Sequence, residues 1–249
     1  MTKTRLKALT TGIVLAAFSL AIPLQASAQD EDRTWLQVRT THVKPDRVQE
    51  FVALQEKFSK ALAADDRPNR DVWQEVRGDN STFHAVTSID DLAELDEPFE
   101  PPMGEKEWDE WVAALLQTID SSTRTILRSH REWTIPADDD AEPGLLRLRS
   151  IRVKPDSMYA YHGWVVNQLI PALKANGAKG VSFNHGAFGG DTSTWVMGSR
   201  LDGFADLQRR KGSLSGMSDE DYGALLGASA DMVVSTDIRI LQYRADLSN

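Results

Sequence analysis

Two copies of one four-residue segment constrain the fold of this chain more than any other feature. Val43-Lys44-Pro45-Asp46 returns 110 residues later as Val153-Lys154-Pro155-Asp156. Each copy follows a run of alternating apolar and polar residues, as in a strand, and precedes apolar residues at helical spacing. The flanks repeat at nearly the same distance, as in Leu36 with Leu146, Arg39 with Arg149, and Ala114-Leu115-Leu116 with Ala224-Leu225-Leu226. The sequence therefore predicts two copies of one folding unit.

Each copy has the pattern strand, helix, strand, strand, helix, strand. In the first copy we expect strands at 35–42, 72–77, 82–88 and 124–133, with helices after Asp46 and at 108–119. In the second copy we expect strands at 145–152, 181–185, 194–199 and 236–244, with helices at 156–175 and 218–232. Pro171 should kink or shorten the first of these two helices, because proline lacks the backbone donor that a helix interior needs.

This element order is that of the ferredoxin-like plait, in which helices cover one face of a single sheet. The bare face of each sheet needs a partner, and the other copy can provide it. We predict an α+β fold of two tandem ferredoxin-like (βαββαβ) domains, packed sheet to sheet. The domains span 33–135 and 145–245, and residues 136–144, where prolines flank three aspartates, form a linker.

The opening of the first copy resembles a known group of proteins. Residues Trp35 to Thr40, Val43 to Asp46 and Glu50-Phe51 look like the first strand and helix of the dimeric α/β-barrel superfamily, with its antibiotic-biosynthesis monooxygenase-like and NIPSNAP-like domains. Members are usually homodimers whose sheets form a barrel, so the resemblance implies a pseudo-dimeric barrel within one monomeric chain. Haem-degrading relatives carry an Asn, Trp and His set that we do not find here, and no cofactor is expected.

The first 28 residues have the pattern of a cleavable signal peptide. Lys3, Arg5 and Lys7 precede an apolar run at 13–22, and Ala26-Ser27-Ala28 fits the cleavage rule. The run is too short for a membrane-spanning helix, although an uncleaved anchor is an alternative. We therefore expect a periplasmic or secreted protein that begins at Gln29 and has no membrane association after cleavage.

Charge and cysteine content exclude several classes of function. The formal net charge of the whole chain is −9, and removing residues 1–28 leaves about −12. Nucleic-acid binding depends on basic surfaces that neutralise phosphates, so nucleic acid is not an expected partner. The chain has no cysteine, which excludes disulfides and thiolate metal sites. The histidines lack the spacings typical of metal sites, so we predict no bound metal.

Arginines on the first strand of each copy are the first candidate ligand-binding residues. If Leu36 and Leu146 face the helices, alternation turns Arg39, Arg147 and Arg149 towards the space between the sheets. A guanidinium there could bind a carboxylate, a phosphate or an enolate through two parallel hydrogen bonds. The alternative is that these arginines pair with acids of the facing sheet or reach solvent.

Two histidines and one tryptophan complete the candidate set. His84 and His185 lie on the predicted hairpin strands, where imidazole could act as a base or a ligand. Trp195 aligns with Phe83 of the first copy, and both could form the floor of an apolar pocket or pack between the sheets.

Three functions stay open on the sequence alone. The first is an exported barrel protein that binds a small organic molecule between its two sheets. The second, allowed by the resemblance, is a cofactor-independent monooxygenase-like enzyme acting on a small aromatic or polyketide-like substrate, in which Arg39, Arg149 or His185 would stabilise an anion. The third is a structural or interaction module with a filled barrel.

Overall fold

The computed structural model describes residues 33–65, 67–138, 144–208 and 211–249. The predicted signal peptide at 1–28 and residues 139–143 of the predicted linker lie outside the described residues, and the proposed domain boundaries stay a prediction. Within the described part, none of the helices has the length and apolar character needed to cross a lipid bilayer.

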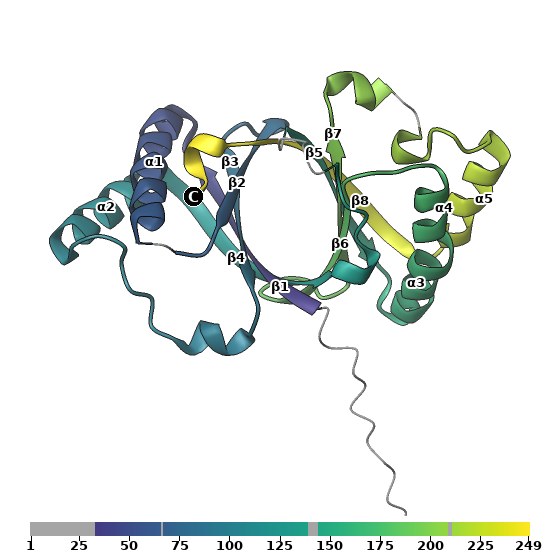
Figure 1. Cartoon of the computed structure of the whole chain (residues 1–249), viewed down its shortest axis with the longest axis horizontal. Helices are drawn as coiled ribbons and strands as arrows, with labels where there is room; N and C mark the ends of the chain where they lie inside the picture. Colours follow the sequence, from purple (N-terminus) through teal and green to yellow (C-terminus); the bar gives the residue numbers. More distant parts are fainter. Residues whose placement is uncertain (1–32, 66, 139–143, 209–210) are drawn as a thin grey trace, which may run out of the picture. The chain divides into compact units, whose positions relative to one another are not determined.

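The two halves of the chain have the same succession of main elements (Figure 1). The first half contains β1 (Arg33–Val43), α1 (Val48–Ala64), β2 (Arg70–Arg77), β3 (Thr82–Ile89), α2 (Glu105–Thr118) and β4 (Ile119–His130). The second half contains β5 (Leu145–Val153), α3 (Met158–Trp164), α4 (Ile170–Ala175), β6 (Val181–Phe188), β7 (Thr194–Leu201), α5 (Asp219–Ala230) and β8 (Val233–Tyr243).

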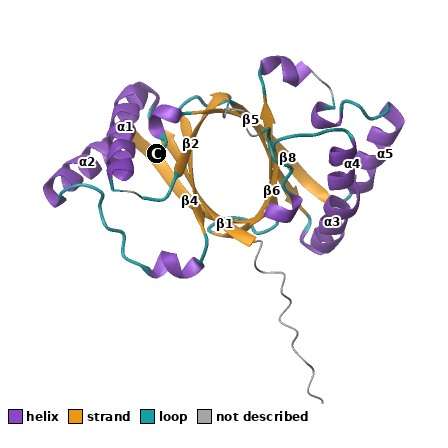
Figure 2. Ribbon diagram, viewed as in Figure 1, coloured by secondary structure: helices purple, strands orange, loops and turns teal. Residues whose placement is uncertain are grey.

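The eight strands form one closed antiparallel barrel in the order β1-β3-β2-β8-β5-β7-β6-β4. Each half contributes four adjacent strands, and backbone pairing joins the halves at two seams, β2 with β8 and β4 with β6. The helices of the two halves lie outside the barrel on opposite sides (Figures 1 and 2). The predicted α+β fold of two tandem ferredoxin-like units in a pseudo-dimeric barrel is confirmed.

Two apolar cores lie between the barrel wall and the helices. In the first half Phe51 of α1 packs on Phe83 of β3, with ring centroids 4.8 Å apart. In the second half Tyr161 and Trp195 take the corresponding places, at 5.5 Å. The repeated sequence thus produces a repeated contact, and Trp195 packs under the helices and not between the sheets.

Two local predictions differ from the structure. The strand predicted at 124–133 runs from Ile119 to His130, because its polar first residues pair with β1 along the barrel. Pro171 does not shorten its helix, which continues to Ala175, and the alternative that it kinks the helix stays a prediction. A π-helical turn at Val165–Leu169 precedes the proline, and such a turn changes the backbone pairing where proline cannot donate.

Each half also sends its final residues into the other half. After β8 the chain returns to the first half, where Leu247 is 0% exposed beside Phe51 and Val72. Its carbonyl accepts hydrogen bonds from Ser59 and from Arg70. After β4, Ile135 is buried in the second half and exchanges two backbone hydrogen bonds with Val181. Neither helix–sheet core is complete without a residue from the other half.

We expect Leu247→Ala to lower the free energy of unfolding by about 2–5 kcal/mol, because truncating a fully buried leucine loses contacts and leaves a cavity. Urea unfolding followed by circular dichroism measures this. Leu116→Ala on α2, where the side chain is 58% exposed, serves as the matched control and should change stability by about 0.5 kcal/mol or less. Equal effects of the two substitutions would contradict the role given to Leu247.

Candidate functional site

Strand register shows which way the candidate arginines face. Arg149 lies opposite Met197, and Met197 belongs to the core under α3 and α4. Directly opposed residues share a face of the sheet, so Arg149 and its neighbour Arg147 face the helices. The prediction that they face the space between the sheets is wrong.

The same correction applies to the first half. Arg39 lies opposite Ala85, which packs against the core formed by Phe51 and Phe83, so Arg39 also faces the helix side. Leu36 and Leu146, which were expected under the helices, face the barrel lumen. Both faces of this sheet are covered, one by helices and one by the rest of the barrel. Alternation of apolar and polar residues therefore cannot tell the two faces apart.

A pocket of about 310 Å³ lies between the sheet and the helices of the second half. Its polar lining residues come from β5, α3, α5, β8 and the loop before α5: Arg147, Arg149, Tyr161, Lys211, Ser213, Tyr222, Ser229 and Thr236. Its apolar walls come mainly from the helices and from β7 and β8, and include Trp164, Leu169, Met197, Leu214, Leu226 and Ile238. The pocket is therefore cationic at one side and apolar at the other.

The two arginines of this pocket meet no acidic partner among the described residues. Among the residues that the structure describes, Arg147 and Arg149 form no ion pair, and the buried Nε atom of each meets no acceptor. Burial, together with the positive charge of Arg149, lowers the pKa of Arg147 below its ordinary value. Buried donors normally find acceptors, so these two Nε atoms are unusual in meeting none among the described residues.

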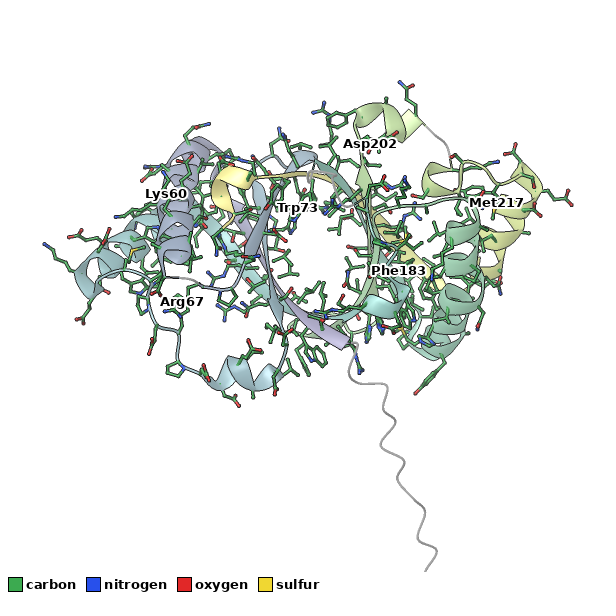
Figure 3. The ribbon with its side chains drawn as sticks, viewed as in Figure 1. Lys60, Arg67, Trp73, Phe183, Asp202 and Met217 are labelled. Carbon is green, nitrogen blue, oxygen red and sulfur yellow. The ribbon has the colours of Figure 1, made fainter. Side chains whose placement is uncertain are left out.

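A tight turn places the Arg147 guanidinium. Gly212 has φ +54°, and a Cβ atom there would lie 2.6 Å from one terminal nitrogen of Arg147. The neighbouring Lys211 donates to the carbonyl of Met217 and pairs with Asp219 at 2.7 Å. Figure 3 shows Met217 among the helices of the second half. The loop thus adds a third positive charge, which is partly neutralised, to the lining.

Tyr161 adds a neutral hydroxyl to the same pocket. Its side chain is 2% exposed, and burial raises its pKa well above the ordinary value of 10, although the charge of Arg149 acts in the opposite direction. The phenol therefore keeps its proton and can donate to a ligand. The corresponding residues of the first half are Phe51 in place of Tyr161 and Gln37 in place of Arg147. Only the second half combines the arginine pair with the phenol.

The structure separates the other predicted site residues. His84 faces the barrel lumen, beside Thr40 and Glu75. His185 lies on the helix side of β6, where its Nδ1 atom is 2.9 Å from Nε2 of His130. Trp195 packs beside His185 and Tyr161, with its ring centroid 5.5 Å from the centroid of each. Of the six candidates, only Arg147 and Arg149 line the pocket itself.

Sequence reasoning missed Tyr161, Tyr222 and Lys211 as pocket residues. One signal was present, since alignment of the two copies sets Tyr161 against Phe51. A tyrosine where the other copy has a phenylalanine indicates that this core position has a different role in the second half. Lys211 and Tyr222 lie on a loop and a helix that only tertiary folding brings to the pocket. No histidine occurs in the described lining of the pocket.

The raised pKa of Tyr161 predicts a specific pH dependence of stability. The folded state holds the phenol proton more tightly than the unfolded state, so this contribution is complete below about pH 10 and is lost as the pH rises above it. When the pH is raised from about 8 to about 10.5, the free energy of unfolding should fall by about 1 kcal/mol less in Tyr161→Phe than in the unchanged protein. Urea unfolding at both pH values measures this, and identical losses would contradict it.

Comparison with known proteins establishes the fold. No protein-family model matches the sequence, and no curated protein matches it either. A candidate monooxygenase from Lactobacillus acidophilus NCFM is similar in structure, with 11% identity and a TM-score of 0.57 over 86% of this chain and 95% of that chain. A candidate monooxygenase from Fusobacterium nucleatum has 12% identity and a TM-score of 0.58 over 84% of this chain and 92% of that chain. An anthrone oxidase-like protein has 12% identity and a TM-score of 0.58 over 88% of this chain and 93% of that chain. At such identities the likeness concerns the fold alone: this chain has the dimeric α/β-barrel fold, built from one polypeptide.

Proposed function

We propose that the second half binds a small organic anion with an apolar body in the pocket between its helices and β5. One observation carries the proposal: Arg147 and Arg149 project into a pocket with buried Nε donors and without an acid among the described residues. Both side chains are half-buried, and leaving a buried donor such as Nε unpaired costs about 1–3 kcal/mol. A ligand that accepts from these donors would remove that cost.

The rest of the lining indicates the class of ligand. Guanidinium groups side by side suit a carboxylate, an enolate or a phenolate, and the Tyr161 hydroxyl adds one neutral donor. The opposite walls, with Trp164, Leu214 and Ile238, suit a flat apolar body. A volume of about 310 Å³ is at the lower end of the range of small-molecule pockets, about 300–1,000 Å³. We therefore favour an aromatic or fused-ring acid over a long chain.

This proposal changes the expected position of the site. The sequence pointed to a ligand between the two sheets, whereas the arginines lie on the helix side of one sheet. Divergence of the two halves supports a single specialised site, because Gln37 and Phe51 occupy the corresponding positions in the first half. Export, the monomeric state and the absence of nucleic-acid and membrane partners stay predictions from the sequence.

Calorimetric titration with 1-naphthoate and with its neutral analogue 1-naphthamide tests the binding proposal. The acid should bind more tightly than the amide, and Arg147→Gln or Arg149→Gln should weaken its binding by about 10- to 100-fold, as expected for a lost charged hydrogen bond. Arg39→Gln is the matched control, since Arg39 corresponds to Arg149 in the first half and should not affect binding. Equal binding of acid and amide, or equal losses in all three variants, would rule the site out.

A monooxygenase-like reaction in the same pocket is the second candidate function. The candidate monooxygenases and the anthrone oxidase-like protein share the fold of this chain. The pocket adds a physical reason, since a cation pair that binds an organic anion also stabilises an enolate formed during a reaction. Substrate deprotonation followed by reaction with oxygen would need such stabilisation.

If this second candidate is right, anthrone should be converted to anthraquinone and water under air faster with the protein than in buffer alone. One molecule of oxygen should be consumed per anthrone. An oxygen electrode and the absorbance of anthraquinone follow the reaction. Arg149→Gln should lower the rate by about 100-fold or more if the arginine acts on a developing negative charge. A rate equal to that in buffer would leave binding as the function that the pocket supports.

A further inference from the structure

The barrel lumen holds a second group of reactive side chains, none of which lines the helix-side pocket. Thr40 of β1 lies directly opposite His84 of β3, and His84 lies opposite Trp73 of β2. Glu75 follows two residues after Trp73, on the same face of β2. Intervening residues such as Phe83 and Val72 belong to the helix-side core, so alternation turns this group towards the lumen. Figure 3 shows Trp73 on the barrel wall.

Hydrogen bonds connect three of these side chains in series. Nδ1 of His84 is 3.0 Å from the hydroxyl of Thr40, and its Nε2 is 3.1 Å from a carboxylate oxygen of Glu75. Glu75 is 1% exposed, yet hydrogen bonds from His84 and Arg239 outweigh its burial and hold its pKa below the ordinary value. An ionised carboxylate only accepts, so Nε2 carries a hydrogen, and in the neutral ring Nδ1 accepts from Thr40.

Arg239 holds the carboxylate in place from the other half of the chain. Its Nη1 atom lies 3.0 and 2.9 Å from the two oxygens of Glu75, across the β2–β8 seam. An ion pair that only stabilised the β2–β8 seam would require Glu75 and Arg239 and no further partner. The bonds to His84 and Thr40 extend it into a hydroxyl–imidazole–carboxylate series, the arrangement that activates a hydroxyl as a nucleophile.

Solvent reaches this part of the lumen. The inward-facing side chains Leu36, Val38 and Val86 are only half-buried, whereas the helix-facing Val43 and Val153 are almost completely buried. The His84 side chain is 13% exposed, and Thr40 is also half-buried. Barrels of eight strands are wide enough to hold one small ligand. A small molecule that enters the lumen would meet Thr40 and His84 on this wall.

Within its described residues, the second half has no equivalent of this arrangement. Ser150 lies opposite Val196 there, as Thr40 lies opposite His84, and Gly186 takes the place of Glu75. The duplicated framework thus keeps a hydroxyl in both halves but pairs it with an imidazole and a carboxylate in the first half. A framework contact of the barrel would be expected in both halves.

We propose that Thr40 is the nucleophile of an acyl-transfer site in the lumen, with His84 as its general base and Glu75 as the residue that positions His84. The substrate class is an activated ester or thioester with a small apolar acyl group. The Thr40 oxygen forms a bond to the acyl carbon, its proton passes to Nδ1 of His84, and the leaving alcohol or thiol takes that proton as its bond to carbon breaks. Water then releases the acid and restores the hydroxyl.

Labelling of the protein with an alkyl fluorophosphonate tests this proposal, and the result does not depend on the helix-side pocket. Attack by Thr40 forms a phosphorus–oxygen bond and expels fluoride, so intact-mass and peptide mass spectrometry should show one adduct, on Thr40. Thr40→Val should abolish the adduct, Thr40→Ser should keep it, and His84→Asn should slow labelling by about 100-fold or more. At equal folded fraction, Glu75→Asp should retain more labelling than Glu75→Gln, because it keeps the charge.

Thr123 provides the matched control. It lies opposite Thr40 on β4 and faces the same side, but no histidine contact is seen for it in the described chain. Thr123→Val should be labelled as fast as the unchanged protein. The proposal is overturned if Thr40 carries no adduct, if Thr123 is labelled as readily as Thr40, or if folded His84→Asn is labelled at the original rate.

Discussion

Closure of the barrel by backbone hydrogen bonds is the interaction on which the rest of this structure depends. A single ferredoxin-like sheet has one bare face and two open edges, and both are unfavourable in water. Here the β2–β8 and β4–β6 seams pair the edges, and the closed barrel covers the faces. The buried tails at Ile135 and Leu247 add a second, reciprocal connection. The two halves are thus parts of one folding unit.

Duplication within one chain allows the two halves to differ, which two identical subunits cannot do. Both halves retain arginines on the helix side of the sheet, but their surroundings have diverged. In the first half the half-buried Arg70 donates to Gln55, Ser59 and the carbonyl of Leu247. Desolvation and the nearby charge of Arg39 lower the pKa of Arg70 to about 10. Protein acceptors thus satisfy its donors. In the second half, Arg147 and Arg149 retain unsatisfied donors beside a pocket.

The lumen and the helix-side pocket provide different chemistry on the two faces of one sheet. The pocket combines positive charge with an apolar wall and suits anion binding. The lumen group contains an ionised carboxylate, an imidazole and a hydroxyl in hydrogen-bonding order. Each arrangement occurs in one half only, so both result from divergence and not from the shared framework. When two halves share one fold but differ in their buried polar side chains, function and not stability is expected to be the reason that those side chains are kept.

The repeated sequence by itself determined that the chain contains two copies of one unit and the order of their elements, because periodicity and turn residues are local properties of the chain. The barrel that the two copies form was implied by the resemblance to dimeric α/β-barrel proteins. The sequence also showed which residues share a face of a strand, as for Arg147 with Arg149. Only the tertiary structure decided which face that was, since helices cover one side of the sheet and the barrel covers the other. Tyr161 and Lys211 join Arg149 in the pocket lining from a helix and a loop, and Thr40, His84 and Glu75 meet from three strands. Such contacts depend on strand register and helix packing, and those are set by burial of the whole surface and not by any local stretch of sequence.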